Sequence, residues 1–312
     1  MGARPHQFRF GGWLVTLCFA LAASTAWSGE RTLVRQFEVG PHAHLVVDAE
    51  LGSITVHGQG GREVTVHADA RGSNRFLTGL ELTAQQGASG VFVNVRMPPR
   101  LRDWFGWDRV RLTIEVPHDC SVQLSTSGGG LDVRDVNAPV RGSTTGGSIF
   151  VAEVVGSVEM NTSGGGIRAE QLSGPIDLGT TGGSITVVHA IGDLEAHSSG
   201  GDIRLENVDA RIRAMTSGGN IRTEGPATHS IYLATSGGNV SLRLPLNAHA
   251  SIDAWARKGG RVRSELPLSR AEIATSAHIR GDFNGGGDSV VLRTSGGRIK
   301  ILSDTHAEVP AL

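Results

Sequence analysis

Five charged residues recur at one fixed spacing and form the strongest candidate for chemistry in this sequence. They are Arg141, Glu159, Asp177, Glu195 and Arg213, and subtracting successive positions gives 18 each time. Carboxylates are the groups with which glycosidases donate protons and attack sugars. On adjacent strands, about 4.8 Å apart, they would lie near the carboxyl separation of a retaining glycosidase. A charged face in contact with water accounts for the same pattern.

Other reactive residue types are isolated. His42 and His44 lie two apart near the start of a strand and could share a face, but no third metal ligand accompanies them. Cys120 has only His118 near it, and we interpret it as a small, partly buried strand residue. The sequence contains no GxSxG, HExxH, phosphate-binding loop or paired-cysteine motif. We therefore expect no catalytic residue, no metal and no cofactor.

The elements that would position the charged residues come from an internal repeat. Each unit begins with a Thr/Ser-Thr/Ser-Gly-Gly tetrapeptide, first at Thr126, Thr144, Thr162, Thr180, Ser198 and Thr216. The spacing is 18 each time, and further copies start at 235 and 294. Apolar residues alternate after each Gly pair, as in Ile149, Ile167 and Ile185, and a second apolar set includes Val158 and Ile176. Each unit therefore predicts a strand, a corner, a second strand and a Gly-Gly turn.

One such unit cannot bury its apolar face alone, but stacked units can. The sequence therefore predicts an all-β fold, a parallel β-solenoid with 18-residue coils in which Ile149, Ile167 and Ile185 lie directly above one another. The Gly pair suits a turn with positive φ or a close approach of stacked backbones. We expect the Thr residues to stack with their copies and their hydroxyls to hydrogen-bond along the ladder. The preference of parallel crossovers favours a right-handed solenoid.

Two other repeat architectures fit less well. A left-handed hexapeptide helix has coils of the same length, but its apolar residues recur every six positions. The calcium-binding nonapeptide repeat needs a further Gly and then an Asp after Gly-Gly-x. Here Ile usually follows Gly-Gly-x, and only Asp132 falls near the required place.

The regular repeats cover 126–244, and the flanking regions are looser. Residues 29–125 read as N-terminal coils of the same solenoid with insertions, although a separate small β domain fits as well. Residues 245–302 are irregular, and we expect their last Thr-Ser-Gly-Gly strand to close the stack. Residues 303–312 read as a tail.

An insertion at 97–109 concentrates aromatic residues in a chain where aromatics make up only 5%. Three interpretations stay open: a cap over the open end of the solenoid, an amphipathic protrusion that contacts a membrane surface, a sugar or a protein, or a loop with no role. In the second case the binding residues are Arg102, Trp104, Phe105, Trp107 and Arg109.

Residues 1–28 read as a signal peptide. Arg4 and Arg9 precede an uncharged stretch, 11–25, and Ala26-Trp27-Ser28 offers a cleavage site. An uncleaved anchor is the alternative. We expect export to the periplasm or cell envelope, or secretion. The net charge of -1 gives no indication of nucleic-acid binding.

The repeated Thr-Ser-Gly-Gly-x-Ile, with Val-x-Gly-x-Ile between copies, resembles the bacterial putative-adhesin family of Gly-rich β-strand repeat proteins of unknown function. The resemblance covers about 45–302 and is firmest over 113–245. It implies a solenoid and an envelope location, and it assigns no catalytic or binding residue. We expect a non-enzymatic envelope protein that presents a surface for adhesion, binding or scaffolding to a protein, a glycan or a membrane. The alternative is a polysaccharide-active β-helix lyase or hydrolase. The oligomeric state stays open.

Overall fold

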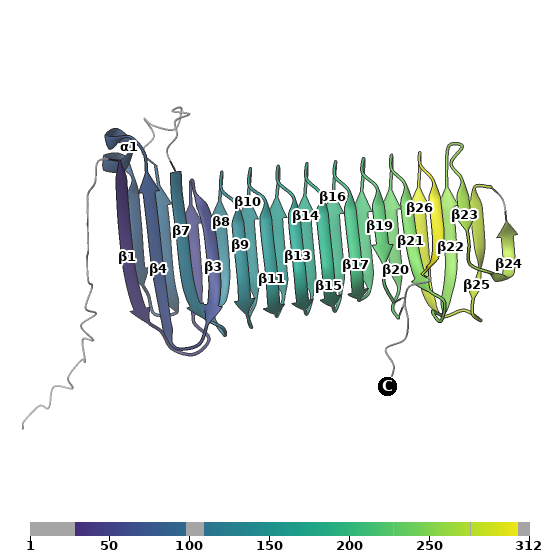
Figure 1. Ribbon diagram of the computed structural model, residues 1–312, viewed down its shortest axis with the longest axis horizontal. Helices are drawn as coiled ribbons and strands as arrows, with labels where there is room; N and C mark the ends of the chain where they lie inside the picture. The colour runs from purple at the N-terminus through teal and green to yellow at the C-terminus, as the bar shows by residue number, and fades with distance from the viewer. Residues whose placement is uncertain (1–28, 98–108, 227, 275, 305–312) are drawn as a thin grey trace, which may run out of the picture.

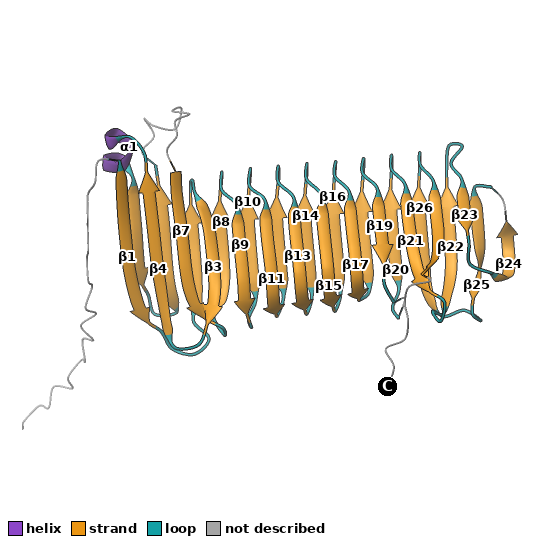
Figure 2. Cartoon of the chain, in the orientation of Figure 1, coloured by secondary structure: helices purple, strands orange, loops and turns teal. Residues whose placement is uncertain are grey.

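The computed structural model describes residues 29–97, 109–226, 228–274 and 276–304. Within these ranges the chain winds into two long β-sheets, A and B, which enclose one apolar core (Figure 1). Figure 2 shows strands along the whole length and a short helix, α1 (Asn74–Gly79), at the N-terminal end. The predicted parallel β-solenoid is confirmed; its right-handed sense stays a prediction.

Sheet A has 13 strands. Their order in space is β1 (Glu30–Glu38), β4 (Glu63–Arg71), β7 (Arg109–Pro117), β3 (Ser53–Gln59), β9 (Leu131–Val136), β11 (Ile149–Val155), β13 (Ile167–Ser173), β15 (Ile185–Ile191), β17 (Ile203–Asp209), β19 (Ile221–Glu224), β21 (Val240–Pro245), β27 (Ile299–Asp304) and β23 (Val262–Ser264).

Sheet B has 14 strands. Their order is β5 (Glu81–Gln86), β6 (Gly90–Arg96), β2 (His44–Ala49), β8 (Ser121–Thr126), β10 (Val140–Thr144), β12 (Val158–Thr162), β14 (Ile176–Thr180), β16 (Leu194–Ser198), β18 (Ile212–Thr216), β20 (Ile231–Thr235), β26 (Asp288–Thr294), β22 (Ala250–Ala256), β25 (His278–Phe283) and β24 (Ser269–Ala274).

Residues 18 positions apart in the regular repeats pair with one another, as predicted. Ile149 pairs with Ile167, and Ile167 pairs with Ile185, in parallel register. All three side chains are buried in the core. A fully buried Ile is worth about 1.5–3 kcal/mol relative to an exposed one, so a column of them stabilises the stack although each coil is rich in Gly.

The Thr that opens each turn is buried and binds the backbone of the neighbouring coil. Thr162 Oγ1 donates to the Gly147 carbonyl oxygen at 2.8 Å and accepts from Gly165 N at 3.3 Å. The same pair of bonds recurs at Thr144, Thr180, Ser198, Thr216, Thr235 and Thr294. The Thr residues therefore stack in register, and each hydroxyl hydrogen-bonds along the stack to the Gly backbone of the previous coil.

The second Gly of each pair is required by close backbone approach. A Cβ on Gly183 would lie 2.0 Å from the Gly165 carbonyl oxygen, whereas one on Gly182 would meet nothing nearer than 3.4 Å. Neither residue has positive φ. Of the two reasons for Gly that the sequence offered, the approach of stacked chains is the one that applies here.

The corner between the two strands of a coil has a component that the sequence did not reveal. Five residues at one repeat position adopt left-handed backbone with φ of 52–60°: Asp135, Glu153, Gln171, His189 and Asn207. This bend turns the next residue, such as Leu172 after Gln171, into the core. Small residues follow three positions after these bends, and Gly174 and Gly192 there also have positive φ.

Neither end of the stack follows the order of the sequence. At the N-terminal end β2 and β3 lie inside β6 and β7, and β1, β4 and β5 finish the sheets in antiparallel pairing. At the C-terminal end β26 lies between β20 and β22, and β27 lies between β21 and β23. The expectation that the last Thr-Ser-Gly-Gly strand closes the stack is therefore wrong. The antiparallel β25 and β24 follow β22 at the edge of sheet B instead.

Substitution of the two glycines in one turn tests the close approach. We expect Gly183→Ala to lower the free energy of unfolding by about 1–3 kcal/mol or more, because its Cβ must displace the neighbouring backbone. Gly182→Ala is the matched control and should change it little. Urea unfolding followed by circular dichroism measures both, and equal midpoints for the two variants would contradict the assignment.

Candidate functional site

The outer face of sheet B carries two columns of outward side chains, because alternate strand residues point away from the core. The first column is Arg141, Glu159, Asp177, Glu195 and Arg213, in direct parallel register. The alignment expected from the 18-residue spacing is confirmed. The second column lies two residues later along each strand and consists, in spatial order, of His197, Met215, Ala234, Arg293 and Trp255.

Basic groups flank the carboxylates of the first column. Arg141 Nε lies 3.1 Å from Glu159 Oε2. Glu195 Oε1 lies 2.7 Å from His197 Nε2 and 3.3 Å from Arg213 Nε. Asp177 stands between the two glutamates. These exposed pairs contribute little to stability individually.

Two neighbouring carboxyls in the middle of the column have pKa values shifted in opposite directions. Partial burial, with the charges of Glu195 and Glu159 beside it, raises the pKa of Asp177. Hydrogen bonding to His197, together with the charge of Arg213, lowers the pKa of Glu195. Two neighbouring carboxyls with pKa values shifted in opposite directions are the pattern that acid–base catalysis uses.

Two grooves lie on this face. The acidic groove, of about 420 Å³, is lined by the first column together with Asp193 and Arg211. The aromatic groove, of about 650 Å³, extends from Thr180 and His197 on one side to Tyr232, Trp255, Arg257 and Arg293 on the other.

Trp255 forms the C-terminal side of the aromatic groove. Its side chain is exposed, and the Arg257 guanidinium lies 4.6 Å from the ring centroid. The Arg293 guanidinium lies 5.6 Å from the same ring, and the His278 ring stacks on it with centroids 5.6 Å apart. Asp253 fixes this arrangement: its carboxylate lies 2.8 Å from both Arg293 Nη2 and His278 Nε2.

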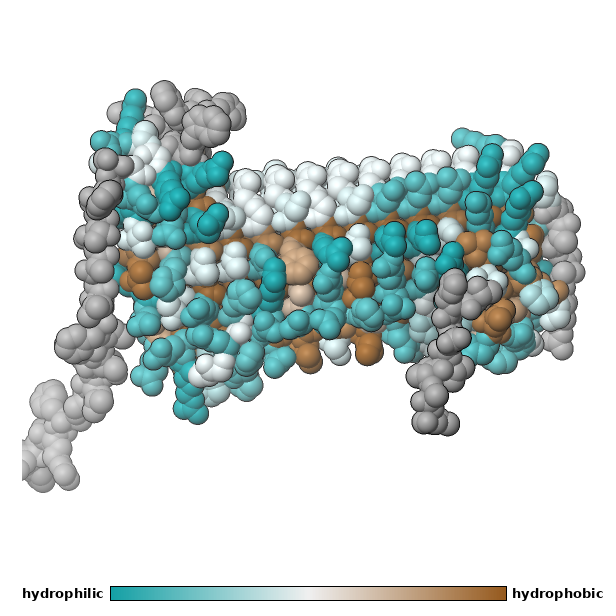
Figure 3. All heavy atoms as spheres, viewed as in Figure 1, coloured by the Kyte–Doolittle hydropathy of each residue, from teal (hydrophilic) through white to brown (hydrophobic). Residues whose placement is uncertain are grey.

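The 13-stranded sheet offers a different surface. Figure 3 shows a band of hydrophobic residues running beneath the pale ridge of turns. Leu131, Ile149 and Ile167 line a groove of about 520 Å³ along this face. Arg134 lies 4.6 Å from the centroid of the Phe150 ring there, so sheet A also has an arginine–aromatic pair.

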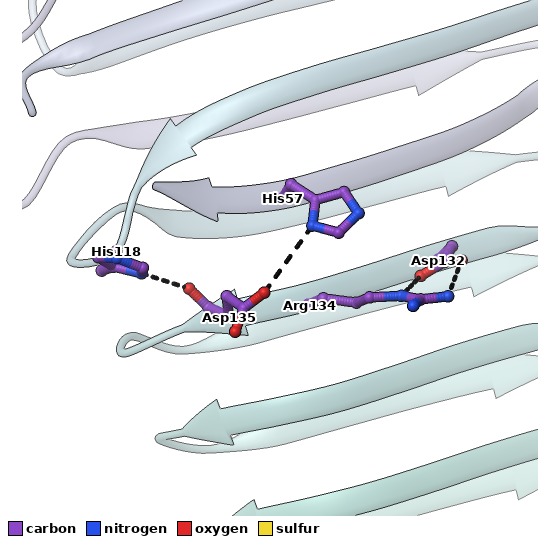
Figure 4. Close-up of polar contacts among 5 residues, drawn as sticks. All are labelled: His57, His118, Asp132, Arg134 and Asp135. Atoms are coloured by element: carbon purple, nitrogen blue, oxygen red, sulfur yellow. Dashed lines mark hydrogen bonds and ion pairs between the residues drawn. The ribbon is translucent and has the colours of Figure 1, made fainter. Parts of the chain in front are cut away.

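A cluster of two histidines and an aspartate occurs where β3, β9 and the β7–β8 turn meet (Figure 4). His118 Nδ1–H donates to the Asp135 backbone carbonyl at 2.7 Å, and His57 Nδ1 lies 3.8 Å from Asp135 Oδ2. A Cβ on Gly58 would lie 1.7 Å from the Asp135 carbonyl oxygen, so the backbones are tightly packed at this point. We interpret this cluster as structural, because its contacts join two strands and a turn.

Among the described residues no group of three or more His, Cys, Asp or Glu side chains could hold a metal ion. His42 and His44, which were candidates to bind one metal ion together, make separate contacts: His42 with Asp119, and His44 with Ser121. Burial raises the pKa of Cys120 to about 12, so its thiol stays protonated and unreactive near neutral pH. In the described ranges no helix is long and apolar enough to cross a membrane.

A model of the Toastrack DUF4097 family matches residues 42–302. The chain belongs to this family. The resemblance read from the Thr-Ser-Gly-Gly repeat is confirmed, and solved structures similar to this Toastrack chain include several described as putative adhesins. No curated protein matches it.

Two of the similar structures represent the range of descriptions. A putative adhesin from Bacteroides fragilis NCTC 9343 has 14% identity and a TM-score of 0.35, over 88% of this chain and 97% of that one. A putative lipid binding protein from Parabacteroides distasonis ATCC 8503 has 12% identity and a TM-score of 0.44, over 86% of this chain and 96% of that one.

Most of the binding residues expected from the sequence of this Toastrack protein, namely Arg102, Trp104, Phe105 and Trp107, lie outside the described residues. Arg109 is described: it is an exposed residue at the start of β7, paired in register with Arg71. The aromatic groove was not predicted from the sequence. Its signal was the chain's single tyrosine, Tyr232, and a tryptophan, Trp255, at outward positions of alternating strands.

The raised pKa of Asp177 leads to a prediction about the pH dependence of the melting temperature. A carboxyl whose folded pKa exceeds its unfolded value destabilises the fold when it is ionised, and this penalty disappears below the unfolded value of 3.8. Asp177→Asn should therefore raise the melting temperature at pH 7 and leave it unchanged near pH 3.

Asp193→Asn is the matched control. The Arg211 partner lowers the pKa of Asp193, so this substitution should have the opposite sign at pH 7. Thermal unfolding at the two pH values measures both variants. A lower melting temperature for Asp177→Asn at pH 7 would contradict the assignment.

Proposed function

We propose that this chain is a non-enzymatic, exported envelope protein that presents the outer face of sheet B as a surface for adhesion or scaffolding. The observation that carries the proposal is the aromatic groove, where Trp255 stays exposed although Arg257, Arg293 and His278 surround it. Exposed aromatic and arginine side chains are the residue types that dominate binding energy at interfaces.

The regular stack supports the same function. The strands under the aromatic groove pair on both sides, so the backbone that carries its side chains is fixed before a ligand binds. The export part of the proposal rests on the signal-like residues 1–28.

Loss of the exposed ring tests the proposal. We expect Trp255→Ala to reduce binding of the purified chain to isolated envelopes of the source organism by about tenfold, as for a central interface residue. Phe150→Ala is the matched control, because it removes the ring of the arginine–aromatic pair on sheet A. Co-sedimentation measures both. Equal binding by the two variants would count against sheet B as the binding face.

The segment 97–109 stays a second proposed contact, through Arg102, Trp104, Phe105, Trp107 and Arg109. The double substitution Trp104→Ala and Trp107→Ala belongs in the same assay. Reduced binding with an unchanged melting temperature supports a binding loop. Loss of the fold means instead that the segment is a cap.

A polysaccharide-active enzyme is the second candidate. The opposite pKa shifts of the adjacent Asp177 and Glu195 carboxyls favour it. If this candidate is right, a screen of polysaccharides will show turnover that disappears when Glu159, Asp177 and Glu195 are changed to Gln, Asn and Gln. Turnover that persists in this variant, or no turnover by the natural chain, rejects the column as a catalytic site.

A further inference from the structure

We propose that the aromatic groove binds an acidic polysaccharide, a chain of sugars that carry carboxylates. This inference rests on the proposed binding function and names its ligand class. It combines three properties of the groove: the sign of its charge, a row of hydroxyl groups, and an exposed aromatic wall.

The charge of the groove favours an anion. Its lining includes Arg257, Arg293 and His197 and no carboxylate. Asp253 neutralises Arg293, and Glu195 binds His197. Arg257 is exposed, and its guanidinium contacts only the Trp255 ring among the interactions of the described residues. A planar guanidinium without a carboxylate partner is suited to bind the carboxylate of a ligand in a bidentate manner.

The turn side of the groove presents hydroxyl groups at a fixed spacing. Ser199, Ser217, Ser236 and Ser295 each follow the buried Thr or Ser of successive coils and line the groove. Strands lie about 4.8 Å apart, so this row offers a donor and an acceptor at each step. The hydroxyls of the buried Thr residues are occupied by Gly backbone, which leaves the serine row for a ligand.

The opposite wall is aromatic. The Arg213 guanidinium lies 5.1 Å from the centroid of the Tyr232 ring. The Trp255 ring lies beside Arg257 and Arg293. Flat amphipathic rings with polar neighbours match a sugar, which has an apolar C–H face and a rim of hydroxyl groups. A single small anion would not need a groove that reaches from β14 to β22.

The rest of the molecule disfavours the other anionic polymers. A nucleic acid needs many phosphate contacts, whereas the net charge is -1 and the groove has two arginines. A lipid tail needs an apolar channel, whereas serine and threonine hydroxyls line much of this groove. The neighbouring acidic groove has four carboxylates against three arginines, so it gives a polyanion no comparable anchor.

Titration of the chain with a labelled oligogalacturonide tests the inference. We expect saturable binding that weakens as salt is raised, and no binding of a dextran of equal length. Arg257→Gln should raise the Kd about tenfold or more, because it removes the unpaired charge. Arg263→Gln is the matched control: it makes the same change at an outward position of β23, on sheet A, and should leave the Kd unchanged.

Three outcomes overturn the inference: equal Kd values for the Arg257 and Arg263 variants, equal binding of dextran, or binding of phosphatidylglycerol vesicles or an oligonucleotide in place of the oligogalacturonide. The envelope assay separates this failure from that of the proposed function. If the natural chain binds envelopes through Trp255 but not the oligogalacturonide, only the ligand class is wrong. If it binds neither, both proposals fail.

Discussion

The hydrogen bonds between each buried Thr hydroxyl and the glycine backbone of its neighbours hold the coils in register. Thr162 illustrates it: one hydroxyl accepts from the turn of its own coil and donates to the turn of the previous one. A buried carbonyl without such a partner costs about 1–3 kcal/mol, so any slip in register would be penalised at every turn. The hydroxyl can reach only because the second Gly lets the turns touch.

This register explains why the outer faces carry columns of chemically distinct character. A position in the repeat becomes a line on the surface, and substitutions along that line change the surface in steps of one strand. On sheet B the first column passes from Arg141 through Glu159, Asp177 and Glu195 to Arg213. Two residues along, the second column ends in Arg293 and Trp255. Acidic and aromatic grooves therefore lie side by side on one sheet without any loop to build them.

The sequence was informative wherever periodicity alone decides the structure. The alternation at Ile149, Ile167 and Ile185 predicts the core, and the same spacing predicts the column around Asp177. Periodicity could not reveal the left-handed bends, because Glu153, Gln171 and His189 share a conformation but no chemical type. Nor could it reveal contacts between segments outside the strict repeat, such as Trp255 with Arg293 across β22 and β26. Those contacts depend on the order of the strands at the ends, which local sequence does not encode.

The interleaved ends have a consequence for how the protein can change in evolution. The coil of β2 and β3 is enclosed by a later segment, and the coil of β26 and β27 fills a place between earlier ones. Units added at either terminus would therefore meet a finished edge. The units between 126 and 216, by contrast, share one register, and gaining or losing one of them lengthens or shortens the molecule by about 4.8 Å without altering its closures. Length is thus free to vary in the middle while both terminal assemblies stay intact.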